Sequence, residues 1–374
     1  MTMAFPSKPL TQLLGSNGTL PCQLPSTQRK LTTLSGPVHA LTYSSSPSTY
    51  ILTGSSDRQI RLYNPSRPAA AASQNPLEPV RATQLIQTYS AHGYEVLDIS
   101  VARDNASFAS VGGDRNVFLW DVTTAKTIRR FGGNQGHTRR VNSVTFAGAD
   151  DSVLVSGSFD ASVRLWDLKA QSQKPIMALE EARDSISCVL VGGGGNGEYE
   201  IVAGSVDGRV RYYDIRMGRL ETDVIGAPIT SLCRTRDGKG VLVGSLDNTL
   251  RLMDRDSAGL LKAYKGEGWK NDEFRLRSCF GGNERWVLSG NEDTSRCPSG
   301  EGEVVVWDTL SGNVAERIRV PAGPDDGKKR IGADGKVKER KNVISCVTWK
   351  ENGRSDQWCC AGTDGIVTVF GPSS

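Results

Sequence analysis

Short apolar runs and small polar turns alternate along most of the chain. A typical unit has a run rich in Val, Ile and Leu, then small residues around an aspartate, then a second run that ends in a bulky side chain. In one such run Val163 and Leu165 flank Arg164, which is the period of a strand with one buried face. Because Asp with small neighbours suits tight turns, the pattern predicts a series of β-hairpins.

The hairpin unit recurs through the sequence with nearly constant spacing. The copies read ILTGSSDRQIRLYN, SFASVGGDRNVFLWD, VLVSGSFDASVRLWD, IVAGSVDGRVRYYD, VLVGSLDNTLRLMD, WVLSGNEDTSRCPSGEGEVVVWD and WCCAGTDGIVTVFG. Their turn aspartates are Asp57, Asp114, Asp160, Asp207, Asp247, Asp293 and Asp364. In the sixth copy Trp307 stands where the other copies place their bulky residue, and the hairpin carries an insertion ahead of it.

The repeat predicts an all-β fold, a seven-bladed β-propeller over residues 29–371. One hairpin cannot bury its apolar face alone, whereas neighbouring blades in a closed ring bury a continuous core and protect strand edges. The last blade ends at Phe370 without an outer strand, and residues 29–35 (RKLTTLS) form an isolated β-like run. We therefore expect the N-terminal strand to complete the last blade, between tails at 1–28 and 372–374.

Two long insertions interrupt the repeat, and both are expected to be loops. Residues 67–84 are polar and rich in Pro and Ala, and residues 322–341 are rich in Gly and basic side chains. The basic cluster consists of Lys328, Lys329, Arg330, Lys336, Lys338, Arg340 and Lys341. A charge cluster of this kind is usually solvated, and the alternative is contact with RNA phosphates or an acidic partner.

Two copies of the repeat carry a further set of polar and aromatic residues. The sets are His92, Ser110, Asp114 and Trp120, then His137, Ser156, Asp160 and Trp166. They resemble the WD-repeat family, in which the histidine comes from the loop that enters the blade and the four side chains hydrogen-bond to one another. A His–Asp–Ser set can suggest a catalytic triad, but the tryptophan and the repetition favour a structural network. The other copies lack the histidine and are expected to depend more on packing.

Composition and charge add no sign of an enzyme. The chain has 45 Lys and Arg residues and 41 Asp and Glu residues. Because the net charge is close to zero, we expect no electrostatic attraction of the whole chain to nucleic acid or to a membrane. No apolar run has the length of a membrane span, and the 8 cysteines form no CxxC pair, which favours reduced thiols in the cytoplasm or nucleus. Metal-binding and phosphate-binding motifs are absent, so we expect no catalysis and no cofactor.

The fourth and fifth copies of the repeat resemble a more specific family within the WD-repeat proteins. LEEARDSISCV, IVAGSVDGRVRYYDIRMGRL and LDNTLRLMDRDSAGLLKAYKG are similar to the mitogen-activated protein kinase organizer family of WD-repeat proteins. This resemblance implies a scaffold, monomeric within larger complexes, whose partners are MAP kinase cascade members, spliceosomal components or both, in nucleus and cytoplasm. An alternative is a substrate receptor of a cullin-4 ubiquitin ligase, because the segment ending at Arg216 (YDIR) resembles the WDxR box of such receptors.

The resemblance also indicates where partners would bind. Propellers of this family bind on the rim that carries the turn aspartates, beside the start of each innermost strand. The candidate residues there are Glu95, Arg139, Arg140, Asn142, Phe159, Arg183, Asp184, Val206, Leu246, Arg275 and Arg277. Phe159 next to two arginines combines an apolar anchor with positive charge, and such residue types dominate binding energy at interfaces.

Overall fold

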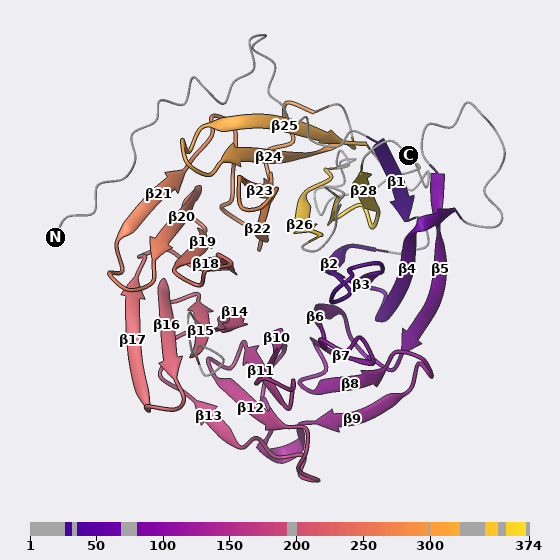
Figure 1. The fold of residues 1–374 in the computed structure, drawn as a ribbon, viewed down its shortest axis with the longest axis vertical. Helices are drawn as coiled ribbons and strands as arrows, with labels where there is room; N and C mark the ends of the chain where they lie inside the picture. The colour runs from indigo at the N-terminus through magenta and orange to yellow at the C-terminus, as the bar shows by residue number, and fades with distance from the viewer. Residues whose placement is uncertain are drawn as a thin grey trace, which may run out of the picture.

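The structure is a computed structural model that describes residues 27–31, 36–68, 81–192, 200–297, 300–321, 341–350 and 357–371. Its strands form five separate four-stranded sheets and one eight-stranded sheet. The eight-stranded sheet consists of two neighbouring blades joined edge to edge, so the ring has seven blades (Figure 1). This confirms the predicted all-β propeller.

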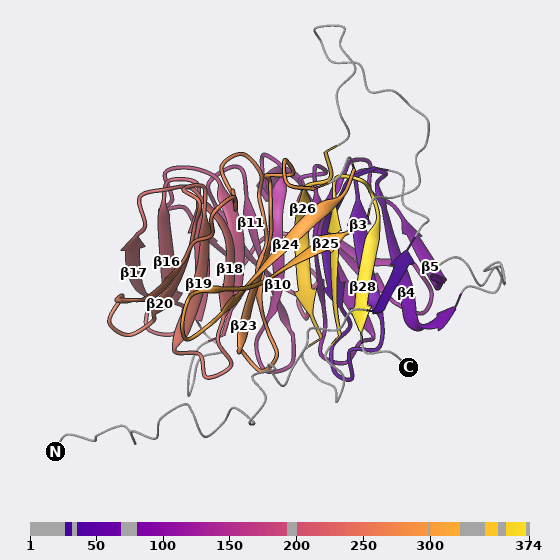
Figure 2. The same ribbon diagram turned by 90° about the horizontal axis from the view of Figure 1, so that it is seen from above.

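Each blade places its first strand at the centre of the ring and its last strand at the periphery (Figures 1 and 2). In order outwards, blade 1 consists of β2 (Val38–Tyr43), β3 (Ile51–Ser55), β4 (Gln59–Pro68) and β5 (Arg81–Ser90), and blade 2 of β6 (Val96–Val101), β7 (Ser107–Gly112), β8 (Val117–Asp121) and β9 (Thr127–Phe131). Blade 3 consists of β10 (Val141–Ala147), β11 (Val153–Ser158), β12 (Val163–Asp167) and β13 (Met177–Leu179), blade 4 of β14 (Ile186–Val191), β15 (Glu200–Ser205), β16 (Arg209–Asp214) and β17 (Arg219–Val224), and blade 5 of β18 (Ile229–Arg234), β19 (Gly240–Ser245), β20 (Thr249–Asp254) and β21 (Leu260–Tyr264). Blade 6 consists of β22 (Ser278–Gly281), β23 (Trp286–Gly290), β24 (Gly302–Asp308) and β25 (Val314–Val320), and blade 7 of β26 (Ile344–Trp349), β27 (Trp358–Gly362), β28 (Val367–Gly371) and β1 (Thr27–Leu31).

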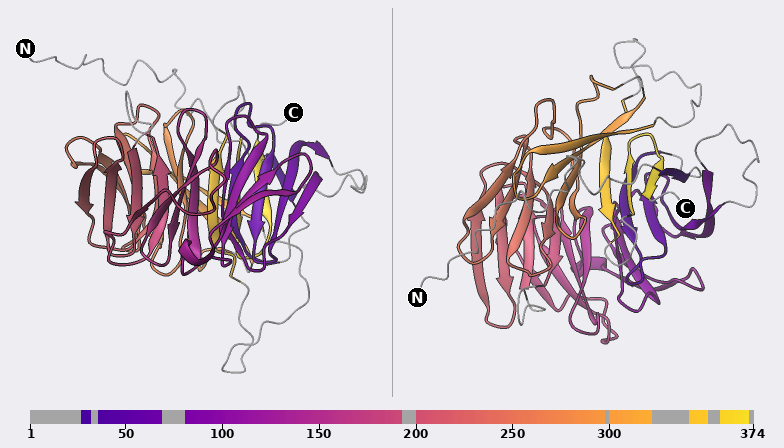
Figure 3. Two further views of the ribbon diagram at one scale, coloured as in Figure 1. Left: turned by 90° about the horizontal axis from the view of Figure 1, so that it is seen from below. Right: turned by 45° about the horizontal axis from the view of Figure 1, so that its top comes forward.

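The core lies between the blades. One apolar cluster contains Ile60 and Tyr89 of blade 1 together with Phe108 and Trp120 of blade 2, and the rings of Tyr89 and Trp120 meet edge to face at 5.8 Å. Each face of a blade thus covers its neighbour, as the stacked strands around the ring show (Figure 3). Because no sheet is stable alone, the blades fold as one domain.

An N-terminal strand closes the ring, as predicted. β1 pairs antiparallel with β28 from Thr27 opposite Gly371 to Leu31 opposite Val367, so it is the outer strand of blade 7. It begins two residues earlier than the expected 29–35, and residues 32–35 lie outside the described part. β1 also pairs parallel with β5 of blade 1, which the sequence did not predict. Both of its edges are therefore occupied, and blades 7 and 1 form one continuous sheet.

The expectation of a loop over residues 67–84 is wrong at both ends of the insertion. β4 continues to Pro68 and β5 starts at Arg81, with Pro68 opposite Thr83 in the ladder. A backbone ladder needs no apolar side chains, so a polar segment can lengthen an outer hairpin. Residues 69–80, the basic insertion up to Arg340 and the outermost ends of the chain lie outside the described residues.

Candidate functional site

A buried network fixes the turn acid in blade 3. Trp166 Nε1 donates to Ser156 Oγ at 2.8 Å, and His137 Nε2 lies 2.8 Å from the same hydroxyl. On its other side His137 Nδ1 lies 3.0 Å from Asp160 Oδ2. A neutral imidazole with its proton on Nδ1 satisfies all three contacts, because Nε2 then accepts the serine proton. Burial lowers the pKa of His137, which favours that neutral form.

Blade 2 repeats the network with closely similar geometry. His92 lies 2.5 Å from Asp114 Oδ2 and 2.7 Å from Ser110 Oγ, and Trp120 Nε1 donates to that hydroxyl at 2.7 Å. The serine and tryptophan are inaccessible to solvent. A nucleophile in this position cannot meet a substrate, so the set holds the blade together and performs no chemistry.

Three other blades hold their turn acid with an arginine. In blades 1 and 4, Arg61 lies 2.7 Å from Asp57 and Arg211 lies 2.6 Å from Asp207. Blade 5 has the equivalent ion pair between Arg251 and its turn acid. These blades therefore have an ion pair in addition to their packing, which the expectation of a greater dependence on packing did not include. The signal was present as D-x-x-x-R in SSDRQIR, SVDGRVR and SLDNTLR, because residues four apart across this turn face each other.

A recurrent backbone hydrogen bond places the partner-binding candidates on one rim. The residue before the turn acid donates its N–H to the carbonyl of the residue before the innermost strand. Phe159 N donates to Arg140 O at 2.9 Å, and Val206 N donates to Ser185 O at 2.9 Å. Leu246 makes the same bond to Pro228. The hairpin turn and the entering loop of a blade therefore form one rigid surface.

Phe159 and the two neighbouring arginines form a cluster on this rim. The Phe159 side chain is 39% exposed, although it stands in a β-rich blade whose other large apolar groups are mostly buried. The guanidinium carbons of Arg140 and Arg139 lie 4.9 Å and 5.6 Å from the centre of its ring. Both arginines are exposed. The cluster, called here the Phe159 patch, presents an aromatic ring with positive charge on it.

The remaining rim candidates are more varied in exposure. Arg183 and Asp184 are exposed in the loop before β14, whereas Glu95, Val206 and Leu246 are half-buried. The structure also exposes Tyr94 by 60% and Phe274 by 41% in the entering loops of blades 2 and 6. Sequence reasoning missed these two residues, although aromatic residues in otherwise polar entering loops were a usable signal.

Comparisons with known proteins agree with this architecture. The family described as "WD domain, G-beta repeat" matches residues 28–64, 83–121 and 126–167. WD repeat domain-containing protein 83 of Homo sapiens is 42% identical over 306 residues, which cover 81% of this chain and 85% of the relative. The chain belongs to the WD-repeat family. Two further similar WD-repeat proteins are the WD repeat domain-containing protein 83 of Rattus norvegicus (41% identity, 73% of this chain, 76% of the relative) and its homolog in Dictyostelium discoideum (30%, 78% and 88%).

The structure corrects the assignment of three rim candidates in this WD-repeat protein. Asn142 is buried, and its amide donates to Ile186 O of the next blade at 2.7 Å, because the ladder of β10 shifts register at this residue. Arg275 and Arg277 precede a short innermost strand and extend across the central channel. Arg275 Nη1 donates to Asn142 O at 2.8 Å, and Arg277 Nη1 lies 2.7 Å from Asp98 Oδ1. They cross the channel and do not form part of the outer rim.

Of the other predicted residues, Arg216 lies away from this rim, whereas Lys341 lies beside it, because its carbonyl accepts from Thr363 Oγ1 at 3.0 Å. Arg216 is exposed in the turn after β16, where its N–H donates to Asp214 Oδ1 at 3.0 Å, while Tyr213 of the same segment is buried. Lys341 is the one member of the basic cluster within the described residues, and it is exposed. In the described ranges no group of His, Cys, Asp and Glu could hold a metal ion, and no helix could cross a membrane.

Proposed function

We propose that this WD-repeat protein is a non-catalytic scaffold, located in nucleus and cytoplasm, that assembles complexes in pre-mRNA splicing, MAP kinase signalling or both. The similarity to WD repeat domain-containing proteins from several organisms supports a scaffold. The kinase and splicing roles rest on the resemblance of blades 4 and 5 to the organizer family. Contact with RNA through the basic insertion is a secondary proposal.

The Phe159 patch is the observation that carries this proposal. Aromatic and arginine side chains are the residues most often responsible for binding energy at protein interfaces. Here the backbone bond between Phe159 and Arg140 holds the backbone of both residues in place before a partner arrives, so little backbone entropy is lost on binding. An exposed ring between two cations suits an acidic segment that also carries an apolar side chain.

Affinity purification from nuclear and cytosolic extracts of the source organism tests the scaffold. Phe159→Ala and Arg140→Ala should reduce recovery of direct partners at least several-fold, while the melting temperature stays within about 2 °C because the replaced groups are exposed. Ile128→Ala, at a 56% exposed position on the outer strand β9, is the matched control. Enrichment of spliceosomal proteins would indicate a role in splicing, and enrichment of MAP kinases would indicate a role in kinase signalling. Unchanged recovery with both rim variants would contradict the assignment of this surface.

A second candidate function uses the opposite face of the ring. Arg216 follows strand β16, so it projects from the end of the blade remote from the turn acids, as a ligase-adaptor contact would require. If the protein is a cullin-4 substrate receptor, Arg216→Ala should abolish co-purification of the ligase adaptor and leave the partners of the Phe159 patch unaffected. Recovery of no adaptor with the wild-type protein would rule this function out.

A further inference from the structure

The central channel contains a cavity of about 610 Å³. Arg275 and Arg277 lie at the end where the innermost strands begin, and their side chains bond to blades 2, 3 and 5 across the channel. The cavity extends from these arginines towards the strand ends at Ser45, Glu284 and Trp349. It therefore has a cationic inner end and lies towards the face opposite the Phe159 patch.

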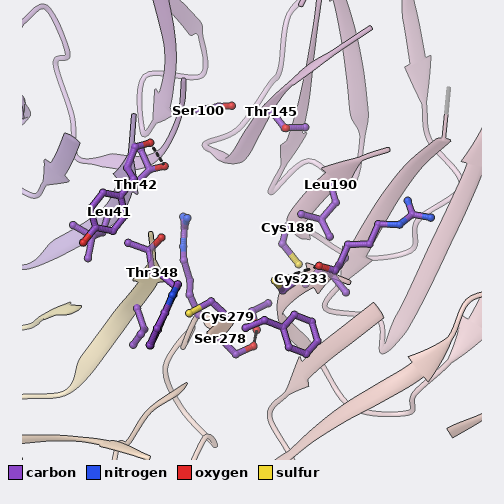
Figure 4. A pocket seen from close by; sticks show the side chains of 18 of the residues that line it. Leu41, Thr42, Ser100, Thr145, Cys188, Leu190, Cys233, Ser278, Cys279 and Thr348 are labelled. Carbon is purple, nitrogen blue, oxygen red and sulfur yellow. Dashed lines mark hydrogen bonds between the residues drawn. The ribbon is translucent and has the colours of Figure 1, made fainter. Parts of the chain in front are cut away.

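The wall of this cavity has two chemically different halves. The fifth residue of each full-length innermost strand, and its equivalent Phe280 in β22, is half-buried and lines the cavity. These positions are Thr42, Ser100, Thr145 and Thr348 in blades 1, 2, 3 and 7, and Leu190, Cys233 and Phe280 in blades 4, 5 and 6. The four hydroxyls thus belong to consecutive blades of the ring, and so do the three apolar or thiol side chains. Figure 4 labels all of these residues except Phe280.

Arg275 differs from Arg277 and Arg234, two other arginines of the cavity, in having no carboxylate partner. Arg277 pairs with Asp98 at 2.7 Å, and Arg234 pairs with Glu200 at 3.0 Å. Arg275 donates to the carbonyls of Asn142 and Thr230, and no acid of the described ranges lies within ion-pair distance of it. Burial, and then the neighbouring charge of Arg277, lowers the pKa of Arg275 to about 10, so the guanidinium still carries its charge at neutral pH.

Arg275 is half-buried, and a half-buried cation without an ion-pair partner is costly, so a bound anion would offset part of that cost. Nη2 of Arg275 makes no hydrogen bond within the described part of the chain, whereas Nε and Nη1 do. A planar guanidinium with a free donor suits a carboxylate or phosphate oxygen. The cavity volume lies within the range of small-molecule sites, which are about 300–1,000 Å³.

We propose that the central cavity binds a small amphipathic organic anion. Its carboxylate or phosphate contacts Arg275 at the inner end of the channel. Its apolar body lies against Leu190 and Phe280, and its polar edge lies against the hydroxyls of the opposite half. This site is distinct from the proposed scaffold surface: Arg275 lies inside the channel near the rim end, and the cavity extends from it towards the opposite face. Carboxylate and phosphate ligands share this chemistry, and separate probes distinguish them.

Calorimetric titration of the full chain with octanoate and with octyl phosphate tests the proposal, with octanol as the uncharged control. We expect at least one of the two anions to bind with a stoichiometry of one per chain. The anion that binds with the higher affinity shows whether the site prefers a carboxylate or a phosphate. Arg275→Gln should weaken binding about ten-fold or more, and Arg275→Lys should restore part of it, since the charge remains. Arg219→Gln, an exposed arginine on the outer strand β17, should leave the affinity unchanged.

Leu190→Ser provides a second variant that leaves both channel arginines in place. It should weaken octanoate or octyl phosphate several-fold and hardly affect inorganic phosphate, because only the apolar contact is lost. Circular dichroism melting verifies that each variant is folded. The proposal is overturned if neither anion binds the wild-type chain, or if folded Arg275→Gln and Leu190→Ser variants both bind as the wild type does.

Discussion

At the scale of single residues, two different chemistries hold the turn acids in this propeller. Blades 2 and 3 use a histidine, a serine and a tryptophan, whereas blades 1, 4 and 5 use an arginine four residues after the acid. Both provide donors to a carboxylate that is otherwise removed from water. The blades differ in how deeply this carboxylate is buried, so the contributions of the turn acids to stability differ as well.

The arginine pairs offer a direct comparison of a buried and a more exposed ion pair. The side chains of Arg211 and Asp207 are 3% and 9% exposed, against 21% and 30% for Arg251 and Asp247. Removing one partner of a buried pair leaves a charge without compensation. Arg211→Met should therefore lower the free energy of unfolding by about 3 kcal/mol, and Arg251→Met by about 1 kcal/mol or less. Urea denaturation measures both, and equal losses would contradict the role of burial.

The turn acid of blade 3 should make stability depend on pH. Burial alone would raise the pKa of Asp160, but hydrogen bonds from His137 and Ser162 lower it below its ordinary 3.8. A carboxyl whose pKa is lower in the folded state stabilises the fold above the unfolded value, and this contribution is lost as the pH falls below about 4. Asp160→Asn should cost about 1–3 kcal/mol at neutral pH and flatten the decline in acid.

Urea denaturation at several pH values between 7 and 2 is the appropriate measurement. Asp256→Asn, at an exposed position, serves as the control and should follow the wild-type curve. An Asp160→Asn variant whose stability falls as steeply in acid as that of the wild type would show that other carboxyls dominate.

At the scale of elements, the strand that closes the ring should be sensitive to backbone changes. Lys30 in β1 stands opposite Thr368 of blade 7 and opposite Ala82 of blade 1, so its backbone lies between two strands. Proline at this position removes a ladder donor and does not fit an interior strand. Lys30→Pro should lower the melting temperature by several degrees, whereas Lys30→Ala should change it little. Identical melting of the two variants would show that β1 does not hold the ring closed.

Most elements of the fold were predictable because they repeat. Seven hairpins with a turn acid and a bulky residue left little choice of architecture, and the missing outer strand of the last blade pointed to β1. The parallel pairing of β1 with β5 was not predictable, because backbone pairing leaves no pattern in side chains. The extension of β4 to Pro68 was missed for the same reason.

At the scale of the whole molecule, side chains connect blades that are far apart in sequence. Asp98 of blade 2 accepts from Arg277 of blade 6 at 2.7 Å, and its other oxygen accepts from Ser143 and Val144 of blade 3 at 2.8 Å and 3.0 Å. The sequence placed Arg277 on the rim because its position in the repeat is that of a rim residue. Only the closed ring brings its side chain within reach of Asp98 on the opposite wall, so the rim prediction failed for this residue.

This contact across the channel should couple the opposite walls energetically. Arg277→Gln and Asp98→Asn should each destabilise the protein, and the double variant should lose less than the sum, with a coupling of about 1–3 kcal/mol. Hydrogen exchange should show faster opening in both β6 and β22 after either single change, although the strands are in different blades. A coupling near zero, or faster exchange confined to the mutated blade, would mean that the ring gains its rigidity from neighbouring blades alone. If the coupling is as predicted, the contact across the channel helps to hold the ring in one conformation. The rim at the end of the ring is then held in place as well.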